Sequence, residues 1–314
     1  MIQAWKIPHI SKGIASCLPL LDAWRLRRAA TGGSDSPRYC YSVWLRHLSI
    51  LGSNGFRVQG AQVGELGPGD SIGTGLAALL SGATQYVALD ILPFSVTADL
   101  PAIFHQLVRM FANCAAIPDH QEFPEVRPRL DSYEFPRQLV DCSTLGARVA
   151  KVERDLNNNP KDRRLITYRV PWNSPDVIDH GSLNLVFSQA VLEHVDALEE
   201  TYFAMSNWLK AGGYMSHVID FGAHHLSPFW DGHRAYRDLE WRLVRGRREF
   251  LLNREPFSTH LNCAEKAGLE VVQILCNVDD NCLPEHCLAP RFQQLSLKDR
   301  HTRGAVLILR KRNS

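Results

Sequence analysis

Seven short apolar runs, separated by longer stretches with helical periodicity, are the feature that most constrains the fold of this chain. The runs begin at residue 61 and are AQVGEL, YVALDI, LITYRV, LNLVFSQ, GYMSHVIDF, LEVVQILC and GAVLILRK. This alternation is typical of a mostly parallel sheet with helices on both faces, because parallel strands need crossover connections. We therefore expect an α/β fold, and the 45% of hydrophobic residues among 314 are enough to fill its core.

Two regions fall outside this alternation. Residues 1–58 look helical, with candidate helices at 12–29 and 39–51 around the turn-rich TGGSDSP, and we expect an N-terminal extension followed by one domain over 59–314. About 70 residues separate the second run from the third, far more than a crossover needs, so we expect an insertion at about 95–163.

The insertion has its own pattern. Residues 96–113 and 138–156 are typical of helices, whereas the proline-rich 118–136 predicts irregular chain. Because the insertion follows the carboxyl end of a strand, it is either a wall or lid of a substrate site or a structural elaboration. The sequence leaves both open.

Composition excludes several function classes. A formal net charge of +2 gives no electrostatic reason to bind nucleic acid, and the basic run at 242–248 is more typical of a solvated helix end. No run approaches the roughly 18 uninterrupted apolar residues of a membrane span, so we expect a soluble, cytoplasmic protein. The eight cysteines include no C-x-x-C pair, and we expect neither a metal site nor a disulfide framework from them.

The stretch VGELGPGDSIGTGL predicts a cofactor loop. Gly67, Gly69 and Gly73 lie where an apolar strand passes into a helix, so a ligand can approach the backbone and its free N–H groups. Asp90 ends the next strand about 20 residues later, where a carboxylate accepts hydrogen bonds from ribose hydroxyls. Glu65 lies two residues before the first glycine, which disfavours a pyrophosphate and favours a cationic amino acid group.

This stretch resembles the first motif of class I S-adenosylmethionine-dependent methyltransferases of the type 11 group. SLNLVFSQAVLEHVDAL at 182–198 and WLKAGGYMSHVIDF at 208–221 resemble the fourth and fifth strands of that family, in the expected order. The resemblance covers about 61–311 and implies a Rossmann-like sheet of order 3-2-1-4-5-7-6 with an antiparallel last strand. It implies S-adenosyl-L-methionine as the cofactor.

The resemblance also implies a cofactor site. Glu65, Gly67 and Gly69 line the methionine part, Asp90 with the adjacent Ile91 lies at the ribose, and Ser188 with Gln189 closes the site from the fourth strand. The chain departs from the family at the end of the third strand, where RVPWNSPD lacks the common acidic residue. We expect Trp172, or a backbone group there, to contact adenine instead.

Methyl transfer is an in-line displacement, and a general base assists it when the acceptor is a hydroxyl. Most candidate bases lie in SHVIDFGAHH, at and after the end of the fifth strand. Strand alternation turns His217 and Asp220 to opposite faces, so these candidates cannot all point into one pocket. The catalytic candidates are His194, His217, Asp220, His224 and His225.

Alternatives remain at each step. The alternative to catalysis for each histidine is a structural role as a hydrogen-bonded imidazole. A divalent ion bound by Asp220, His224 and His225 is disfavoured, because adjacent histidines rarely bind one ion. The segment 247–272, with its LNR, shows a weaker likeness to methyltransferases of polysaccharide and glycan gene clusters. We expect methyl transfer to a small-molecule or glycan acceptor, at oxygen. The alternatives are an inactive scaffold of this fold and, less favoured, a nicotinamide-dependent reductase.

Overall fold

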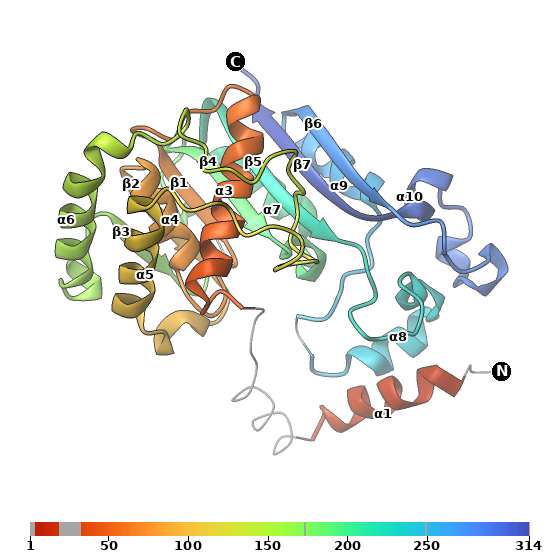
Figure 1. The fold of residues 1–314 in the computed structure, drawn as a ribbon. Helices are drawn as coiled ribbons and strands as arrows, with labels where there is room; N and C mark the ends of the chain where they lie inside the picture. The colour runs from red at the N-terminus through yellow and green to blue at the C-terminus, as the bar shows by residue number, and fades with distance from the viewer. Residues whose placement is uncertain (1–3, 19–32, 173, 249, 314) are drawn as a thin grey trace.

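The computed structural model describes residues 4–18, 33–172, 174–248 and 250–313 and is built around one seven-stranded sheet (Figure 1). The strand order is β3-β2-β1-β4-β5-β7-β6. Neighbouring strands from β3 to β5 are parallel, whereas β7 is antiparallel to both β5 and β6. The strands are β1 Gln62–Leu66, β2 Gln85–Leu89, β3 Ile166–Arg169, β4 Leu183–Gln189, β5 Leu209–Asp220, β6 Leu269–Val278 and β7 Thr302–Lys311.

This topology confirms the predicted fold class. Each of the seven apolar runs forms a strand, in the order that the resemblance implied. The central strands read as nearly continuous apolar runs because helices bury both of their faces. The glycine loop between β1 and α4 and the residues after β4 and β5 therefore meet at the carboxyl end of the sheet.

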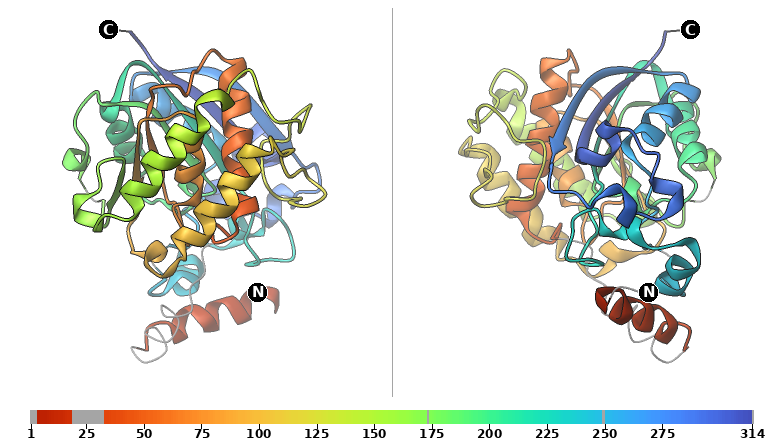
Figure 2. Two further views of the ribbon diagram at one scale, coloured as in Figure 1. Left: turned by 60° about the vertical axis from the view of Figure 1, so that its left-hand side comes forward. Right: turned by 90° about the vertical axis from the view of Figure 1, so that its right-hand side faces the viewer.

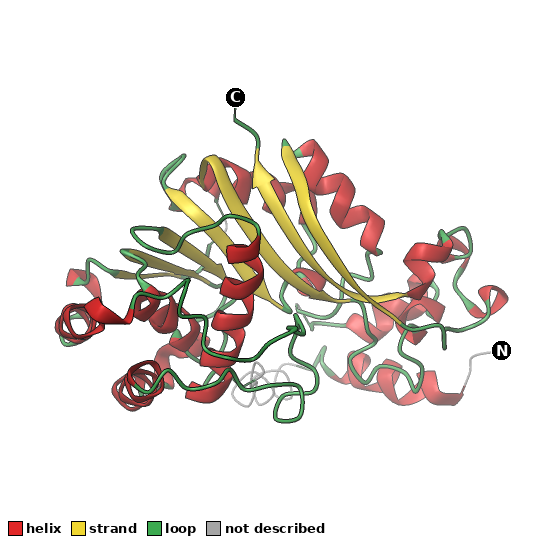
Figure 3. Ribbon diagram, turned by 45° about the horizontal axis from the view of Figure 1, so that its top comes forward, coloured by secondary structure: helices red, strands yellow, loops and turns green. Residues whose placement is uncertain are grey.

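Helices cover both faces of the sheet (Figure 3). One face and its core carry α3 Pro37–Ser53, α4 Gly73–Ser81, α5 Leu100–Ala112 and α6 Leu145–Leu156. The other carries α7 Leu198–Trp208 and α9 Phe257–Lys266. The short helices α8 Asp238–Arg245 and α10 Leu297–His301 follow β5 and precede β7.

The N-terminal region contributes two helices with different surroundings. α3 covers the predicted 39–51 helix and buries Trp44 and nine other residues in the core of the main domain. α1, Ile7–Ala15, instead packs on α8 (Figure 2), where Lys6 donates to the carbonyl of Ala235 and pairs with Glu240 at 2.9 Å. The predicted 12–29 helix overlaps α1 only at its start, and 19–32 lie outside the described residues.

The insertion folds as its pattern predicts. α5 and α6 cover most of the two helical stretches, although the second begins at Leu145 rather than 138, after Asp141 caps a turn of 3-10 helix. The chain over 118–136 forms neither helix nor strand. The buried Arg46 holds it by donating to the carbonyls of Pro118, Val126 and Pro128 at 2.8, 2.6 and 3.2 Å. None of the helices in the described ranges is both long and apolar enough to cross a bilayer.

Candidate functional site

The glycine loop between β1 and α4 is shaped by two left-handed residues. Gly67 and Gly69 have φ of +67° and +75°, a region that favours glycine. A Cβ on Gly67 would lie 2.6 Å from a methyl group of Val191, so the loop passes directly against the segment after β4. The loop therefore offers bare backbone to a ligand, as the sequence predicts.

Glu65 is buried beneath this loop. Its carboxylate accepts a hydrogen bond from the Tyr86 hydroxyl at 2.5 Å, and Thr74 provides a second side-chain hydrogen bond. Burial raises the pKa of Glu65 to about 8, and the charge of Asp90 adds to the rise, whereas the two hydrogen bonds oppose it. A carboxyl group held mostly neutral in this way gains strongly from a nearby cation.

Asp90 follows β2 and faces the same loop. Its carboxylate accepts from the backbone N–H of Ile91 at 2.7 Å and from those of Leu92 and Gly69. Burial raises the pKa of Asp90 to about 6 although these hydrogen bonds lower it. Among the predicted cofactor residues, the structure thus brings together Glu65, Gly67, Gly69, Asp90 and Ile91.

A short segment before α3 covers the loop, which the sequence did not indicate. The Ser71 N–H donates to the Ser34 hydroxyl at 3.0 Å, and the Ser71 hydroxyl donates to the Ser34 carbonyl. At the start of α4, a Cβ on Gly73 would lie 2.5 Å from the sulfur of Cys40 on α3. The N-terminal end of α3 therefore forms one wall of the candidate cofactor site.

The other three predicted cofactor residues have different surroundings. The Trp172 N–H donates to the Asp90 carbonyl at 3.0 Å, while its indole packs edge-to-face on Trp208 of α7, with 5.6 Å between ring centroids. Ser188 is buried towards α7 and bonds the His217 ring at 2.8 Å. Gln189 faces the opposite side of the sheet.

His47 of α3 is a buried residue that no sequence pattern singled out. Its ring bonds Ser216 of β5 at 2.7 Å through Nδ1 and Gln189 at 3.1 Å through Nε2. Burial lowers the pKa of His47 to about 4, although the Gln189 hydrogen bond raises it. A neutral imidazole thus ties α3 to the ends of β4 and β5.

Asp220 and His224 form a pair at the end of β5. The His224 Nε2 donates to Asp220 at 3.1 Å, and the Gly222 N–H donates to the same carboxylate at 2.7 Å. Burial opposes ionisation of Asp220, but the His224 and Gly222 hydrogen bonds outweigh it and lower its pKa. Burial also lowers the pKa of His224, but Asp220 and the charge of Glu193 reverse this and raise it.

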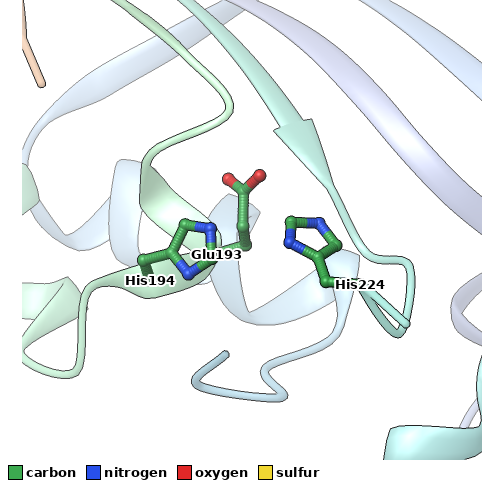
Figure 4. A group of neighbouring side chains, drawn as sticks. All are labelled: Glu193, His194 and His224. Carbon is green, nitrogen blue, oxygen red and sulfur yellow. The ribbon is translucent and has the colours of Figure 1, made fainter. Parts of the chain in front are cut away.

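Glu193 and His194 lie beside this pair (Figure 4). Both belong to a 3-10 helix, Leu192–His194, that follows β4. Burial raises the pKa of Glu193 to about 8, and burial lowers the pKa of His194 to about 4. The ring centroids of His194 and His224 lie 5.2 Å apart, and the ring planes make an angle of 64°. The loops after β4 and β5 therefore meet here.

The remaining catalytic candidates lie apart from this group. His217 has no exposed surface and packs against Tyr202 on the α7 side, whereas Val218 lies in the core on the opposite side of the sheet, so the predicted alternation is confirmed. His225 is exposed and adopts a φ of +64°. The structure therefore unites His194, Asp220 and His224 and leaves His217 and His225 outside.

Asn253 and Arg254 hold the long loop after α8 in place. The Asn253 side-chain amide donates to the carbonyls of Leu192 and Val195 at 2.8 and 2.7 Å, on either side of Glu193 and His194. Arg254 is buried, donates to the Tyr236 carbonyl at 2.7 Å and stacks on Trp241. Both residues therefore position the loops.

A cleft of about 530 Å³ opens at the carboxyl end of β4 and β5. It is bounded by β6, β7, Tyr39 of α3 and the irregular part of the insertion. The cleft adjoins the cofactor loop, because Ala190 lines it and the next residue, Val191, contacts Gly67. The insertion therefore supplies a wall of this cleft.

Three arginines line the cleft, namely Arg127, Arg129 and Arg303. Arg129 makes no hydrogen bond or ion pair within the described chain, and Arg127 donates only to the carbonyls of Pro124 and Val126. Burial lowers the pKa of Arg127, and the charges of Arg129 and Arg303 lower it further, whereas the charge of Glu125, which also lines the cleft, raises it. Cations held together in this way favour an anionic ligand.

Comparison with known proteins gives distant structural likenesses only. No protein-family profile matches the chain, and no curated protein matches it. A methyltransferase from Mesorhizobium loti is 14% identical, with 84% of this chain and 96% of that chain covered and a TM-score of 0.42. A putative sarcosine dimethylglycine methyltransferase from Galdieria sulphuraria is 12% identical, with 85% and 84% covered and a TM-score of 0.44. The cyclase SpnF is 10% identical, with 86% and 81% covered and a TM-score of 0.44.

These scores are too low to carry an argument about activity, and a fold does not by itself fix a function. The topology of the sheet identifies the fold instead, because its strand order, its antiparallel β7 and its glycine loop after β1 match what the resemblance implied. The chain has the fold of the class I S-adenosylmethionine-dependent methyltransferases.

Proposed function

We propose that this protein transfers a methyl group from S-adenosylmethionine to an oxygen of a small-molecule or glycan acceptor. The observation that carries the proposal is the convergence of Glu65, the bare glycine loop and Asp90 beside a cleft. A buried carboxyl group suits the cationic amino acid end of the cofactor, and Asp90 suits the ribose hydroxyls. Ile91 and the backbone of Trp172 extend this site towards the adenine.

The cleft suggests the chemical class of the acceptor. Arg127 and Arg129 form no ion pair among the described residues, and Arg303, which pairs with Asp279 at 3.2 Å, lines the same cleft. We propose that the acceptor carries a carboxylate or phosphate group for these arginines as well as the reacting hydroxyl. Gln189 lines the same cleft and faces the acceptor rather than the cofactor.

S-adenosylmethionine, held by Glu65, the glycine loop and Asp90, would supply the methyl group for an in-line displacement in which the acceptor hydroxyl is the nucleophile. The hydroxyl proton passes to the Asp220–His224 pair, because Asp220 lines the cleft. His217 and His225 take no part in this step.

The test is a turnover assay that detects S-adenosylhomocysteine with a panel of hydroxy acids and sugar phosphates. We expect product above the hydrolysis background with an anionic acceptor, and at least a tenfold loss of kcat/KM, about 1.4 kcal/mol, for Arg129→Ala. Cofactor binding without turnover on any acceptor would favour the scaffold alternative. Binding of a nicotinamide cofactor instead would overturn the proposal.

A further inference from the structure

Glu193, His194 and His224 form a compact group next to the cleft. One possible ligand atom of each residue lies within 4.8 Å of the other two. Figure 4 shows the Glu193 side chain rising between the imidazole rings of His194 and His224, with His224 on the loop after β5. The group adjoins the cleft because Asp220, which lines it, bonds His224.

His194 and His224 each use one ring nitrogen in a hydrogen bond to a residue outside the group. An ionised Asp220 can only accept a hydrogen bond, so the neutral His224 ring carries its one proton on Nε2 and presents a lone pair at Nδ1. The His194 ring hydrogen-bonds the backbone of Phe250, whereas its Nδ1 is buried and finds no partner in the described chain. Each ring therefore keeps one nitrogen lone pair.

Glu193 adds a third electron-pair donor. Its Oε1 accepts the backbone N–H of Asp220 at 3.4 Å, and its Oε2 is buried with no hydrogen-bond partner within the described residues. A buried polar atom without a hydrogen-bond partner destabilises the folded protein. A single cation would give a partner to Glu193 Oε2, to His194 Nδ1 and to the lone pair on His224 Nδ1.

The surroundings of the group resemble those of metal ligands. Histidines that bind metals commonly donate their second N–H to a carboxylate or a backbone carbonyl, which fixes the ring and its tautomer. His224 does so with Asp220, and Phe250 supplies the backbone partner for His194. Asn253 holds the 3-10 helix of Glu193 and His194 from both sides, so these ligands are positioned in advance.

We propose that Glu193, His194 and His224 bind one divalent transition-metal ion. One carboxylate oxygen and two imidazole nitrogens suit ions such as Zn²⁺, Co²⁺ and Fe²⁺, and three protein ligands leave coordination positions open. The ion's role rests on the proposed function: it would bind the acceptor hydroxyl and lower the pKa of that group, leaving Asp220 to take the proton. Binding of the ion does not rest on that function.

This assignment differs from the sequence-based expectation of no metal and from the disfavoured set of Asp220, His224 and His225. Asp220 does not bind the ion itself, and it affects ion binding through its hydrogen bond to the far nitrogen of His224. His225 is exposed outside the group, although its φ of +64° resembles the +44° of His224. His225→Ala is therefore a matched control for His224→Ala in backbone strain and sequence position.

The experiment titrates the chelator-treated full-length protein with Co²⁺ and follows the visible absorption of the bound ion, with Zn²⁺ calorimetry as a second readout. We expect one ion per chain and at least tenfold weaker binding in Glu193→Gln and His224→Ala. Asp220→Asn is expected to weaken binding by about 10–100-fold. His225→Ala is expected to bind like the unchanged protein.

The same preparations are titrated with S-adenosylhomocysteine, which we expect to bind equally in all variants and so to show that they are folded. No Co²⁺ absorption in the unchanged protein would overturn the ion site, as would equal binding by His224→Ala and His225→Ala. If the unchanged protein binds Co²⁺ but not S-adenosylhomocysteine, the proposed function is overturned and the ion site is retained.

Discussion

Binding of S-adenosylhomocysteine is expected to release nearly one proton at pH 7, and Glu65 is its source. Burial raises the pKa of Glu65 to about 8, so roughly nine in ten of these carboxyl groups are protonated at pH 7 in the free protein. The ligand amino group is a cation, and its contact favours the ionised carboxylate. The expected release is therefore about 0.9 proton at pH 7 and less than about 0.5 above pH 8.

Calorimetry in buffers of different ionisation enthalpy measures this release. Glu65→Gln is expected to abolish it and to weaken binding by roughly tenfold to a hundredfold, about 1.4–2.8 kcal/mol. Tyr86→Phe removes the 2.5 Å hydrogen bond that lowers the pKa of Glu65, so proton release should persist to higher pH. Equal release by Glu65→Gln and the unchanged protein would refute this explanation.

Two stability predictions follow from the same structure. Gly67→Ala should lower the free energy of unfolding, measured in denaturant, by about 2–4 kcal/mol, because the strain of a left-handed backbone adds to a clash with Val191. The control Gly60→Ala, at φ +77° with open space around it, should lower that free energy by about 1–2 kcal/mol. Equal losses in the two variants would rule out the clash. Burial lowers the pKa of His47 to about 4 and those of His217 and His260 to about 3. Below pH 6.5 these three histidines are therefore protonated in the unfolded chain and stay neutral in the folded chain. Unfolding free energy should therefore fall as pH drops from about 6.5 to 4, by about 1.4 kcal/mol per pH unit for each histidine. His47→Gln should lessen that slope by one histidine's share, and an unchanged slope would contradict this.

The strands and the conformation of the glycine loop were predictable because their signals are local. Apolar β-rich runs with helical spacers determine a doubly covered sheet, and Gly67 and Gly69 have φ values that glycine favours. The alternation along β5 likewise predicted that His217 and Val218 lie on opposite faces of the sheet. In each case a few neighbouring residues of the sequence carry the signal.

The acceptor side was not predictable in the same way, because its contacts join distant segments. Arg127 and Arg129 sit in irregular chain that carries no periodic signal, and the buried Arg46 holds that chain at the cleft. His47 lies 142 residues from its partner Gln189. Only the folded sheet brings His224 to within reach of Glu193 and His194.

The most direct test of the proposed activity is calorimetric titration of the purified protein with S-adenosylhomocysteine, with Asp90→Ala and NAD(H) and NADP(H) titrations in parallel. We predict micromolar binding of the homocysteine compound that weakens at least tenfold in Asp90→Ala, about 1.4 kcal/mol, and no nicotinamide binding. A folded protein that does not bind S-adenosylhomocysteine, or that binds it equally well without the Asp90 carboxylate, would contradict the proposed cofactor site.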